Sequence, residues 1–154
     1  MSVESARKYL VEKNLEDHII EMEVSTATVD LAANALGVTP GEIAKSLTLW
    51  DKDKEPIMIV MAGDKKIDNK KYKGSFQTKA KMLSFEEVEE FIGHKVGGVC
   101  PFGVKEGVKL YLDQSLKEYE TVYPACGSEF VVAKFKVDEL KDAINAQGWV
   151  DIGK

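Results

Sequence analysis

The sequence predicts an α+β fold built on a mixed, strongly curved β-sheet, a partial barrel, with surrounding helices. Apolar residues repeat at helical spacing in some segments and at strand spacing in others. The helical segments interrupt a largely β core without a regular alternation, and glycines and prolines separate the elements. The length of 154 residues suits one domain, so we expect residues 1–154 to form a single unit.

The composition is that of a folded protein, with 44% hydrophobic and 31% charged residues. A net charge of −5 argues against nucleic-acid binding through one overwhelming basic face, but it leaves a local basic patch open. No stretch has the apolar length of a signal peptide or a membrane helix, which predicts a cytoplasmic protein without a membrane partner. The two cysteines, Cys100 and Cys126, are expected to be reduced thiols.

The first part of the chain predicts two helices with a short strand between them. Val3, Ala6 and Leu10 have helical spacing, so a helix over the first dozen residues should end near Asn14. A strand is expected over roughly 18–22. The clearest helix has the apolar face Val29, Ala32, Ala33 and Leu36, with Gly37 placed to end it in a left-handed conformation.

A second, short helix is predicted to start at Thr39-Pro40-Gly41-Glu42. This tetrapeptide combines a threonine cap, proline at the first helical position and a glutamate that completes a capping box. Ile43, Ala44 and Leu47 would form the apolar side of the helix. Lys45 would then lie near its end, at a helix–strand junction.

The middle of the chain predicts a hairpin, a lysine-rich segment and another helix. Residues 46–50 and 56–62 are apolar around a charged turn, and the second strand should be buried on both faces. Seven lysines crowd the segment 64–82, namely Lys65, Lys66, Lys70, Lys71, Lys73, Lys79 and Lys81. Ser84 and Glu87 form a capping box before a helix with the apolar face Phe85, Val88, Phe91 and Ile92.

The last part of the chain is read as three strands and a closing helix. Residues 109–112 alternate as a half-buried strand. Residues 121–125 and 129–135 are expected to be strands on either side of a tight turn, Cys126-Gly127-Ser128. The closing helix has Val137, Leu140 and Ile144 on its apolar face and should stop near Gly148.

The stretch Val96 to Gly103, with the sequence VGGVCPFG, is the strongest candidate for a site. Paired glycines expose backbone N–H groups without side chains in the way, and Pro101 stiffens the loop. Such a segment suits the binding of an oxyanion or a carbonyl oxygen by the main chain. Its alternative role is that of a simple turn.

Two other candidates have ordinary alternatives. Residues 29–47 fit a DNA-binding helix-turn-helix, but the second helix offers one lysine for base contacts, so DNA binding is the weaker hypothesis. Lys45 itself is either a solvated charge at a helix end or an ammonium that holds a phosphate or substrate oxygen. The lysine-rich segment is either a solvated surface or a face that steers a polyanion.

Cysteine and metal chemistry are both disfavoured. Cys100 could act as a nucleophile with His94 or His18 as base, but a free cysteine more commonly fills a small buried site. A metal site is not expected, because the two cysteines and two histidines show no close ligand pair.

Three separated motifs together resemble one known family. Lys45 in GEIAKSLTLW, the loop VGGVCPFG and the later VYPACGS, preceded by STATVDLAANALGV, are similar in order and spacing to the YbaK and prolyl-tRNA-synthetase-associated editing-domain family. The likeness runs from Ser25 to the last helix. Cys100 departs from the family pattern, in which serine or another small residue is more usual.

The resemblance implies a free-standing deacylase that hydrolyses the ester of a mischarged aminoacyl-tRNA without a cofactor. The substrate would be tRNA for proline carrying cysteine, alanine or another small amino acid, and prolyl-tRNA synthetase would be a protein partner. It implies a catalytic centre at Lys45, Gly97, Gly98 and Pro101. The expected substrate-binding residues are Val99, Cys100, Phe102, Gly103, Cys126 and Gly127, and the expected tRNA-steering residues are Lys65, Lys66, Lys70, Lys71 and Lys73.

The chemistry of ester hydrolysis agrees with these residues, because it needs a positioned water and oxyanion donors more than a strong nucleophile. In a cysteinyl ester the thiol of the substrate could attack instead of water. The competing hypothesis is a non-catalytic module that binds an aminoacyl group or a tRNA end. The amino acid removed, the tRNA and the oligomeric state stay open.

Overall fold

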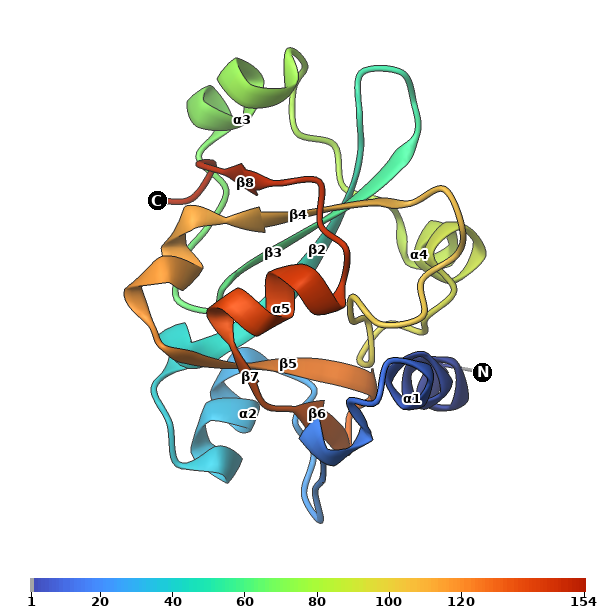
Figure 1. The fold of residues 1–154 in the computed structure, drawn as a ribbon. Coiled ribbons are helices and arrows are strands. Elements are labelled where there is room, and N and C mark those ends of the chain that lie inside the picture. Colours follow the sequence, from blue (N-terminus) through green and yellow to red (C-terminus); the bar gives the residue numbers. More distant parts are fainter. Residues whose placement is uncertain (1) are drawn as a thin grey trace.

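The computed structural model describes residues 2–154 as one mixed sheet with helices around it (Figure 1). The helices are α1 (Ser2–Glu12), α2 (Val29–Leu36), α3 (Asn69–Phe76), α4 (Phe85–Ile92) and α5 (Val137–Ala143). The strands are β1 (Ile19–Glu21), β2 (Ile43–Trp50), β3 (Pro56–Ala62), β4 (Lys109–Asp113), β5 (Thr121–Ser128), β6 (Val131–Ala133), β7 (Phe135–Lys136) and β8 (Trp149–Val150).

The strand order is β1-β6-β5-β2-β3-β4-β8, and β7 pairs with β5 off this path. β2 and β3 form an antiparallel hairpin, whereas β2–β5, β3–β4 and β4–β8 are parallel pairs. This mixture of directions confirms the predicted α+β class with a mixed sheet. The strong curvature stays a prediction.

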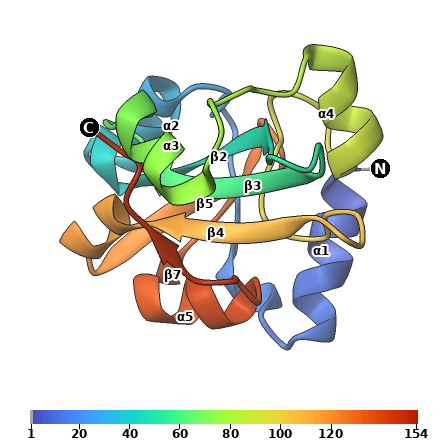
Figure 2. The ribbon, with the colours of Figure 1, turned by 90° about the horizontal axis from the view of Figure 1, so that it is seen from above.

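The core explains why β3 reads as an almost continuous apolar run. Met58 and Val60 face a large cluster that includes residues of α1, α4 and α5. Ile57, Ile59 and Met61 face a second cluster that contains Tyr72 of α3. Figure 2 shows α5 and α3 on opposite sides of β4, in agreement with these two clusters. The prediction that this strand is buried on both faces is confirmed.

Several local signals have the predicted result. α1 ends two residues before Asn14, and β1 lies within the expected segment. Gly37 ends α2 with a left-handed φ of 71°, and Ser84 and Glu87 form the capping box of α4. These signals depend on neighbours in the sequence, so the tertiary fold does not alter them.

The predicted helix from Thr39 to Leu47 is wrong. The capping box forms, but it starts only a 3₁₀ turn over Pro40–Glu42, and β2 begins at Ile43. Pairing with β3 from Ala44 to Trp50 and with β5 at Ile43 and Ala44 outweighs the local helical signal. Lys45 therefore lies in a strand, and the helix-turn-helix alternative fails because its second helix is absent from this described segment.

Four smaller features differ from what the sequence predicts. Cys126, Gly127 and Ser128 are the last residues of β5, where the register shifts, and the turn lies at 129–130. Phe85 begins α4 but is 72% exposed, so it does not belong to the buried face. The closing helix α5 ends at Ala143, before the predicted Gly148. The lysine-rich segment contains a helix, α3, that its low apolar content does not predict.

Among the helices described between residues 2 and 154, none combines the length and the apolar character that a membrane crossing requires.

Candidate active site

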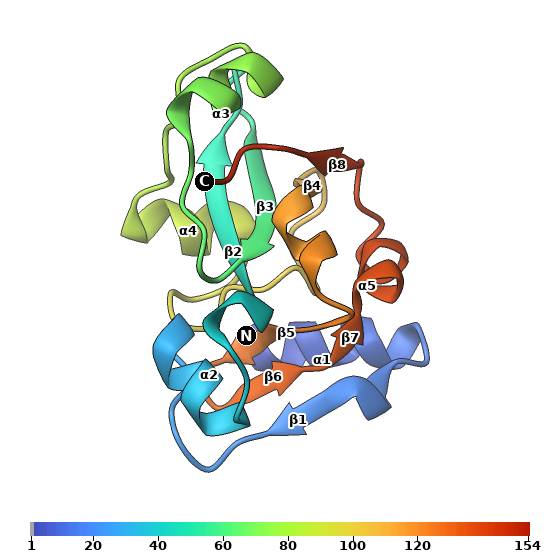
Figure 3. The ribbon, with the colours of Figure 1, turned by 90° about the vertical axis from the view of Figure 1, so that its left-hand side faces the viewer.

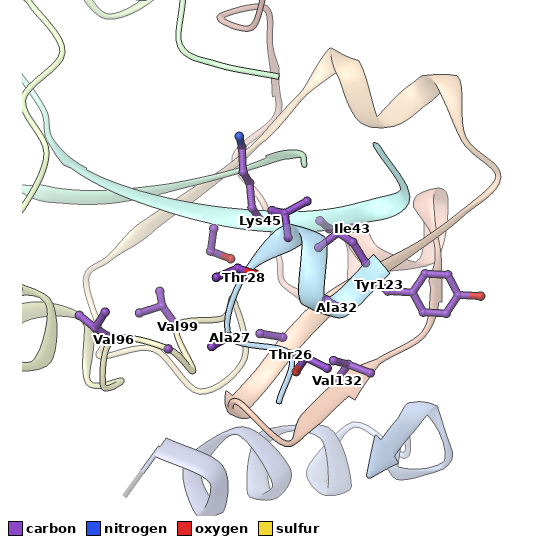
Figure 4. A pocket seen from close by; sticks show the side chains of 15 residues that line it. Thr26, Ala27, Thr28, Ala32, Ile43, Lys45, Val96, Val99, Tyr123 and Val132 are labelled. Carbon is purple, nitrogen blue, oxygen red and sulfur yellow. The ribbon is translucent and has the colours of Figure 1, made fainter. Parts of the chain in front are cut away.

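A cavity of about 230 Å³ opens where β2 and β5 meet, and four parts of the chain line it (Figure 4). They are the segment 26–32 at the start of α2, the first half of β2, the glycine loop at 96–99, and β5 with β6. The lining is mostly small and apolar, with contributions from Ala27, Val29, Ala32, Ile43, Val99, Ala125 and Val132.

Hydrogen bonds fix the two threonines of the cavity wall, Thr26 and Thr28, in place. The Thr28 hydroxyl accepts from the backbone N–H of Leu31 at 3.1 Å and so caps α2. The Thr26 hydroxyl donates to the carbonyl of Glu129 at 2.7 Å, and the N–H of Thr26 donates to the same carbonyl. This part of the wall is therefore tied both to α2 and to the turn between β5 and β6.

Lys45 lies at the edge of the cavity with its ammonium directed away from Thr26 and Val132 (Figure 4). Its Nζ donates to the carbonyl of Gly63 at 3.3 Å and to the carbonyl of Lys65. Burial lowers the pKa of Lys45, while the nearby carboxylate of Asp64 opposes that shift. The side chain thus places a positive charge beside an apolar hollow, next to two backbone oxygens.

The glycine loop offers donors at Gly97 and Val99. Gly97 has a φ of 99°, and nothing lies within 4 Å of the position where a Cβ would stand. The N–H of Gly98 donates to the carbonyl of Lys95 at 3.0 Å, so it is not available to a ligand in this arrangement. Within residues 2–154, no acceptor is bonded to the N–H of Gly97 or Val99, and both residues line the cavity.

Gly98 is needed for packing. A Cβ at this position would lie 2.5 Å from the carbonyl carbon of Gly127, a distance that real side chains do not reach. Gly127 in turn has a φ of 89° and lies against the backbone of Ser2. The two glycines bring the loop, β5 and α1 together.

The remaining predicted residues lie behind the cavity wall and do not line it. Cys100, Pro101, Phe102 and Cys126 are buried, and the rings of Tyr9 and Phe135 flank the ring of Phe102. Gly103 packs against the backbone of Ser5. The structure therefore brings Lys45, Gly97 and Val99 together at the cavity and places the other members of the motif as their support.

Cys100 and His94 are close but shielded. The Sγ of Cys100 lies 3.5 Å from Nε2 of His94, and both side chains are fully buried. Burial raises the pKa of the Cys100 thiol and lowers the pKa of His94. His18 stacks on Phe135, whose ring in turn stacks on Phe102, and it does not line the cavity. A thiolate nucleophile at the cavity is therefore disfavoured.

The lysines expected to steer tRNA differ in their surroundings. Lys71 donates to Asp151 at 3.1 Å and to the carbonyl of Gly153, whereas Lys66, Lys70 and Lys73 are exposed. Lys65 is half-buried, and its carbonyl holds Lys45. Across residues 2–154, no group of three or more potential metal ligands comes together.

Sequence reasoning did not find the polar lining residues Thr26, Thr28, Ser46 and Tyr123. The capping position of Thr28 before an apolar helix was a usable signal. Ser46 has a buried hydroxyl without a partner in the described part of the chain. Its place beside the cavity follows from the pairing of β2 with distant strands, which a local pattern does not contain.

The fold and the cavity are those of a small α+β domain with a compact, mostly apolar cavity. Residues 23–143 match the aminoacyl-tRNA editing domain, and the chain belongs to that family.

Similar proteins extend over most of the chain. An uncharacterized protein, YwhH of Bacillus subtilis, is 45% identical over 154 residues, covering 100% of this chain and 98% of that protein. EbsC of Enterococcus faecalis carries the provisional name Cys-tRNA(Pro)/Cys-tRNA(Cys) deacylase. EbsC is 26% identical to this chain over 133 residues, which are 86% of this chain and 76% of EbsC.

A crystal structure of a protein proposed as a trans-editing enzyme for prolyl tRNA synthetase has a TM-score of 0.88 and 27% identity. The match covers 99% of this chain and 97% of that one. The proline–tRNA ligase of Aquifex aeolicus is 31% identical over 90 residues, which are 58% of this chain and 16% of the ligase.

Proposed function

We propose that this protein is a trans-editing deacylase that hydrolyses the ester bond of mischarged aminoacyl-tRNA, with tRNA for proline carrying cysteine, alanine or another small amino acid as its substrate. One observation carries the proposal. A small apolar cavity is lined by Gly97 and Val99, whose N–H groups have no acceptor within residues 2–154, and by Lys45, whose ammonium lies at its rim.

The size of the cavity supports a small amino acid. Its volume of about 230 Å³ is below the roughly 300–1,000 Å³ of common ligand pockets. Val29, Ala32 and Val132 offer apolar surface and no charge to a side chain. Size discriminates by only about 1–3 kcal/mol per methylene, so we expect a graded preference among small side chains.

The N–H groups of Gly97 and Val99, which have no acceptor in the described chain from 2 to 154, would stabilise the oxyanion that forms when water attacks the ester carbonyl. The ester carbon–oxygen bond then breaks, the ribose oxygen leaves with a proton, and the free amino acid and uncharged tRNA are the products. In a cysteinyl ester the thiol of the substrate can attack the carbonyl instead, so that a carbon–sulfur bond forms, the ribose oxygen leaves with the thiol proton, and water later opens the cyclic thioester to free cysteine. Lys45 would hold the ribose or the terminal phosphate at the rim.

The test is ester hydrolysis on a panel of tRNAs charged with alanine, serine, cysteine and proline. We expect Lys45→Ala to lower kcat/KM at least about tenfold, since a charge-assisted hydrogen bond contributes about 1.5–3 kcal/mol. Lys8→Ala, at an exposed position of α1, is the matched control and should keep the rate.

If no charged tRNA is hydrolysed faster than in buffer, the deacylase proposal fails. Tight binding of charged tRNA without turnover would then favour the alternative, a module that only recognises the aminoacylated end. The absence of a nucleophile–base pair among the residues that line the cavity is the observation behind this alternative.

A further inference from the structure

Two lysine-lined hollows lie at the far end of β2 from the cavity. The first, of about 490 Å³, is lined by the hairpin turn, the segment before α4 and α4 itself, through Trp50, Asp51, Lys52, Lys54, Thr78, Lys79, Lys81 and Glu87. The second, of about 470 Å³, is lined by α3 and the segment that follows it, through Asn69, Lys70, Lys73, Lys79 and Ala80. The hollows meet at Lys79, and we call the two together the lysine groove.

The lysine groove has a strong positive surplus in a protein whose net charge is −5. Six lysines line it against two carboxylates, and all six lysines are exposed. Within residues 2–154, no salt bridge joins any of the six to an acidic side chain. Their charges are thus available to a ligand.

The two carboxylates of the groove already serve the backbone. Asp51 accepts from the N–H groups of Asp53 and Glu55 at 2.8 and 2.9 Å, which closes the hairpin turn. Glu87 accepts from the N–H of Ser84 at 2.7 Å, as part of the cap of α4. These bonds hold both carboxylates in turn and cap positions.

The shape favours a ligand with many charges over a single small anion. The lysines come from three segments, namely the turn at 52–54, α3 and the stretch 79–81, and they spread over two adjoining hollows. Trp50 adds an aromatic surface at the same place. Repeated cationic side chains beside an aromatic ring are the pattern of a surface that follows a nucleic-acid backbone.

The groove and the cavity lie at opposite ends of one strand. Figure 3 shows β2 running from the region of α2 toward α3. From Lys45 to Trp50 the strand spans about 17 Å, at about 3.3 Å per residue. A ligand whose ester lies in the cavity reaches the groove only if a sugar–phosphate backbone continues from the ester.

We propose that the lysine groove binds the phosphate backbone of the RNA whose aminoacylated end lies in the cavity. This inference rests on the proposed function and identifies the surface that distinguishes a whole tRNA from its terminal aminoacyl-nucleoside. Lys70 and Lys73 were expected from the sequence to steer tRNA, whereas Lys52, Lys54, Lys79 and Lys81 extend the surface to the hairpin and to α4.

The experiment compares Lys79→Gln/Lys81→Gln with the control Lys8→Gln/Lys134→Gln, which makes the same change in net charge. Lys8 and Lys134 are exposed, and they lie near α1 and β6, at the opposite end of the molecule from α3 (Figure 1). The first measurement is the Kd for an RNA hairpin that has a single-stranded 3′ end and carries no amino acid. This Kd is measured as a function of salt concentration.

Each lost phosphate contact should lower the salt slope by about 0.9, so the groove variant should lose about 1.8 in slope and about 60-fold in affinity at 0.1 M salt. The control should bind like the wild type. An unchanged slope in the groove variant overturns the inference. Equal competition by polyglutamate of the same charge also overturns it, because the groove would then recognise acidic protein.

The second measurement separates this inference from the proposed function. Wild type and variants are given aminoacyl-tRNA and, separately, an aminoacyl ester of adenosine. The groove variant should lose kcat/KM for the tRNA at least tenfold and keep its rate on the short ester. Equal loss on both substrates contradicts an RNA-backbone role, whereas a wild type inactive on both contradicts the deacylase and leaves the RNA titration as the test of the groove.

Discussion

At the residue scale, the glycine loop separates two roles that look identical in the sequence. Gly97 stands in open space with a positive φ, beside the cavity, while Gly98 is locked against Gly127 by packing. The paired glycines predict that the backbone of the loop lies very close to another group. The contact of Gly98 with the backbone of Gly127 confirms this. The sequence does not tell which glycine faces the cavity and which packs against the protein, because that depends on β5, about 30 residues later.

We expect Gly97→Ala to reduce ester hydrolysis by more than its effect on stability explains. A Cβ at positive φ costs about 1–2 kcal/mol, and relief of that strain would turn the Gly97 N–H away from the ester. The measurement is kcat/KM together with the free energy of unfolding from urea titration.

Gly107→Ala is the matched control for this change. Gly107 also has a positive φ, 94°, with nothing within 4 Å of a Cβ, and it does not line the cavity. It should lose similar stability and keep its activity. If both variants lose activity equally, the loop donor has no special role.

At the element scale, α2 connects helix capping to the site. Thr28 caps α2 with its hydroxyl and lines the cavity, whereas Ser84 makes the equivalent cap on α4, outside the cavity. Thr28→Ala and Ser84→Ala should each cost about 1 kcal/mol of unfolding free energy.

Only the loss of the α2 cap should lower the rate of deacylation, because the frayed helix start forms part of the cavity wall. Thr28→Ser keeps the hydroxyl and should restore most of the stability and the rate. Thermal unfolding and hydrolysis of the short aminoacyl ester check both effects. A rate loss of the same size in Ser84→Ala would contradict this link.

The start of β2 is a part of the fold that local sequence signals do not predict. The capping signal at Thr39 is present and does form, yet the chain leaves the helical path after Glu42. The chain continues as a strand because β2 pairs with β3 and β5, which come later in the sequence. In these pairs Lys45 lies opposite Met61 and Ile43 lies opposite Tyr123. The helices whose ends carry capping residues in the sequence could be predicted. The part of the cavity wall that Val132 contributes could not.

At the scale of the whole molecule, the buried His94 links stability to pH. Its Nε2 faces the carbonyl of Phe102 at 2.7 Å, and burial lowers the pKa of the ring in the folded state. The unfolded chain therefore takes up a proton first as the pH falls below about 6.5, while the folded protein stays neutral at this site.

Stability should be fully present above pH 6.5 and should fall by about 1.4 kcal/mol per pH unit until the lowered pKa is reached. Urea unfolding at pH 7, 6 and 5 measures this slope. His94→Gln should be less stable at pH 7 and should have a flatter profile over the same range. An identical pH slope in both proteins would assign the loss to other groups.

The joining of β2 and β5 also determines when the cavity comes into existence. Its walls come from positions 26–46, 96–99 and 123–132, and the contact between Ile43 and Tyr123 closes a loop of about 80 residues. Such a closure has a high entropy cost and belongs to the later steps of folding. During synthesis, the cavity is therefore complete only after β5 and β6 have left the ribosome.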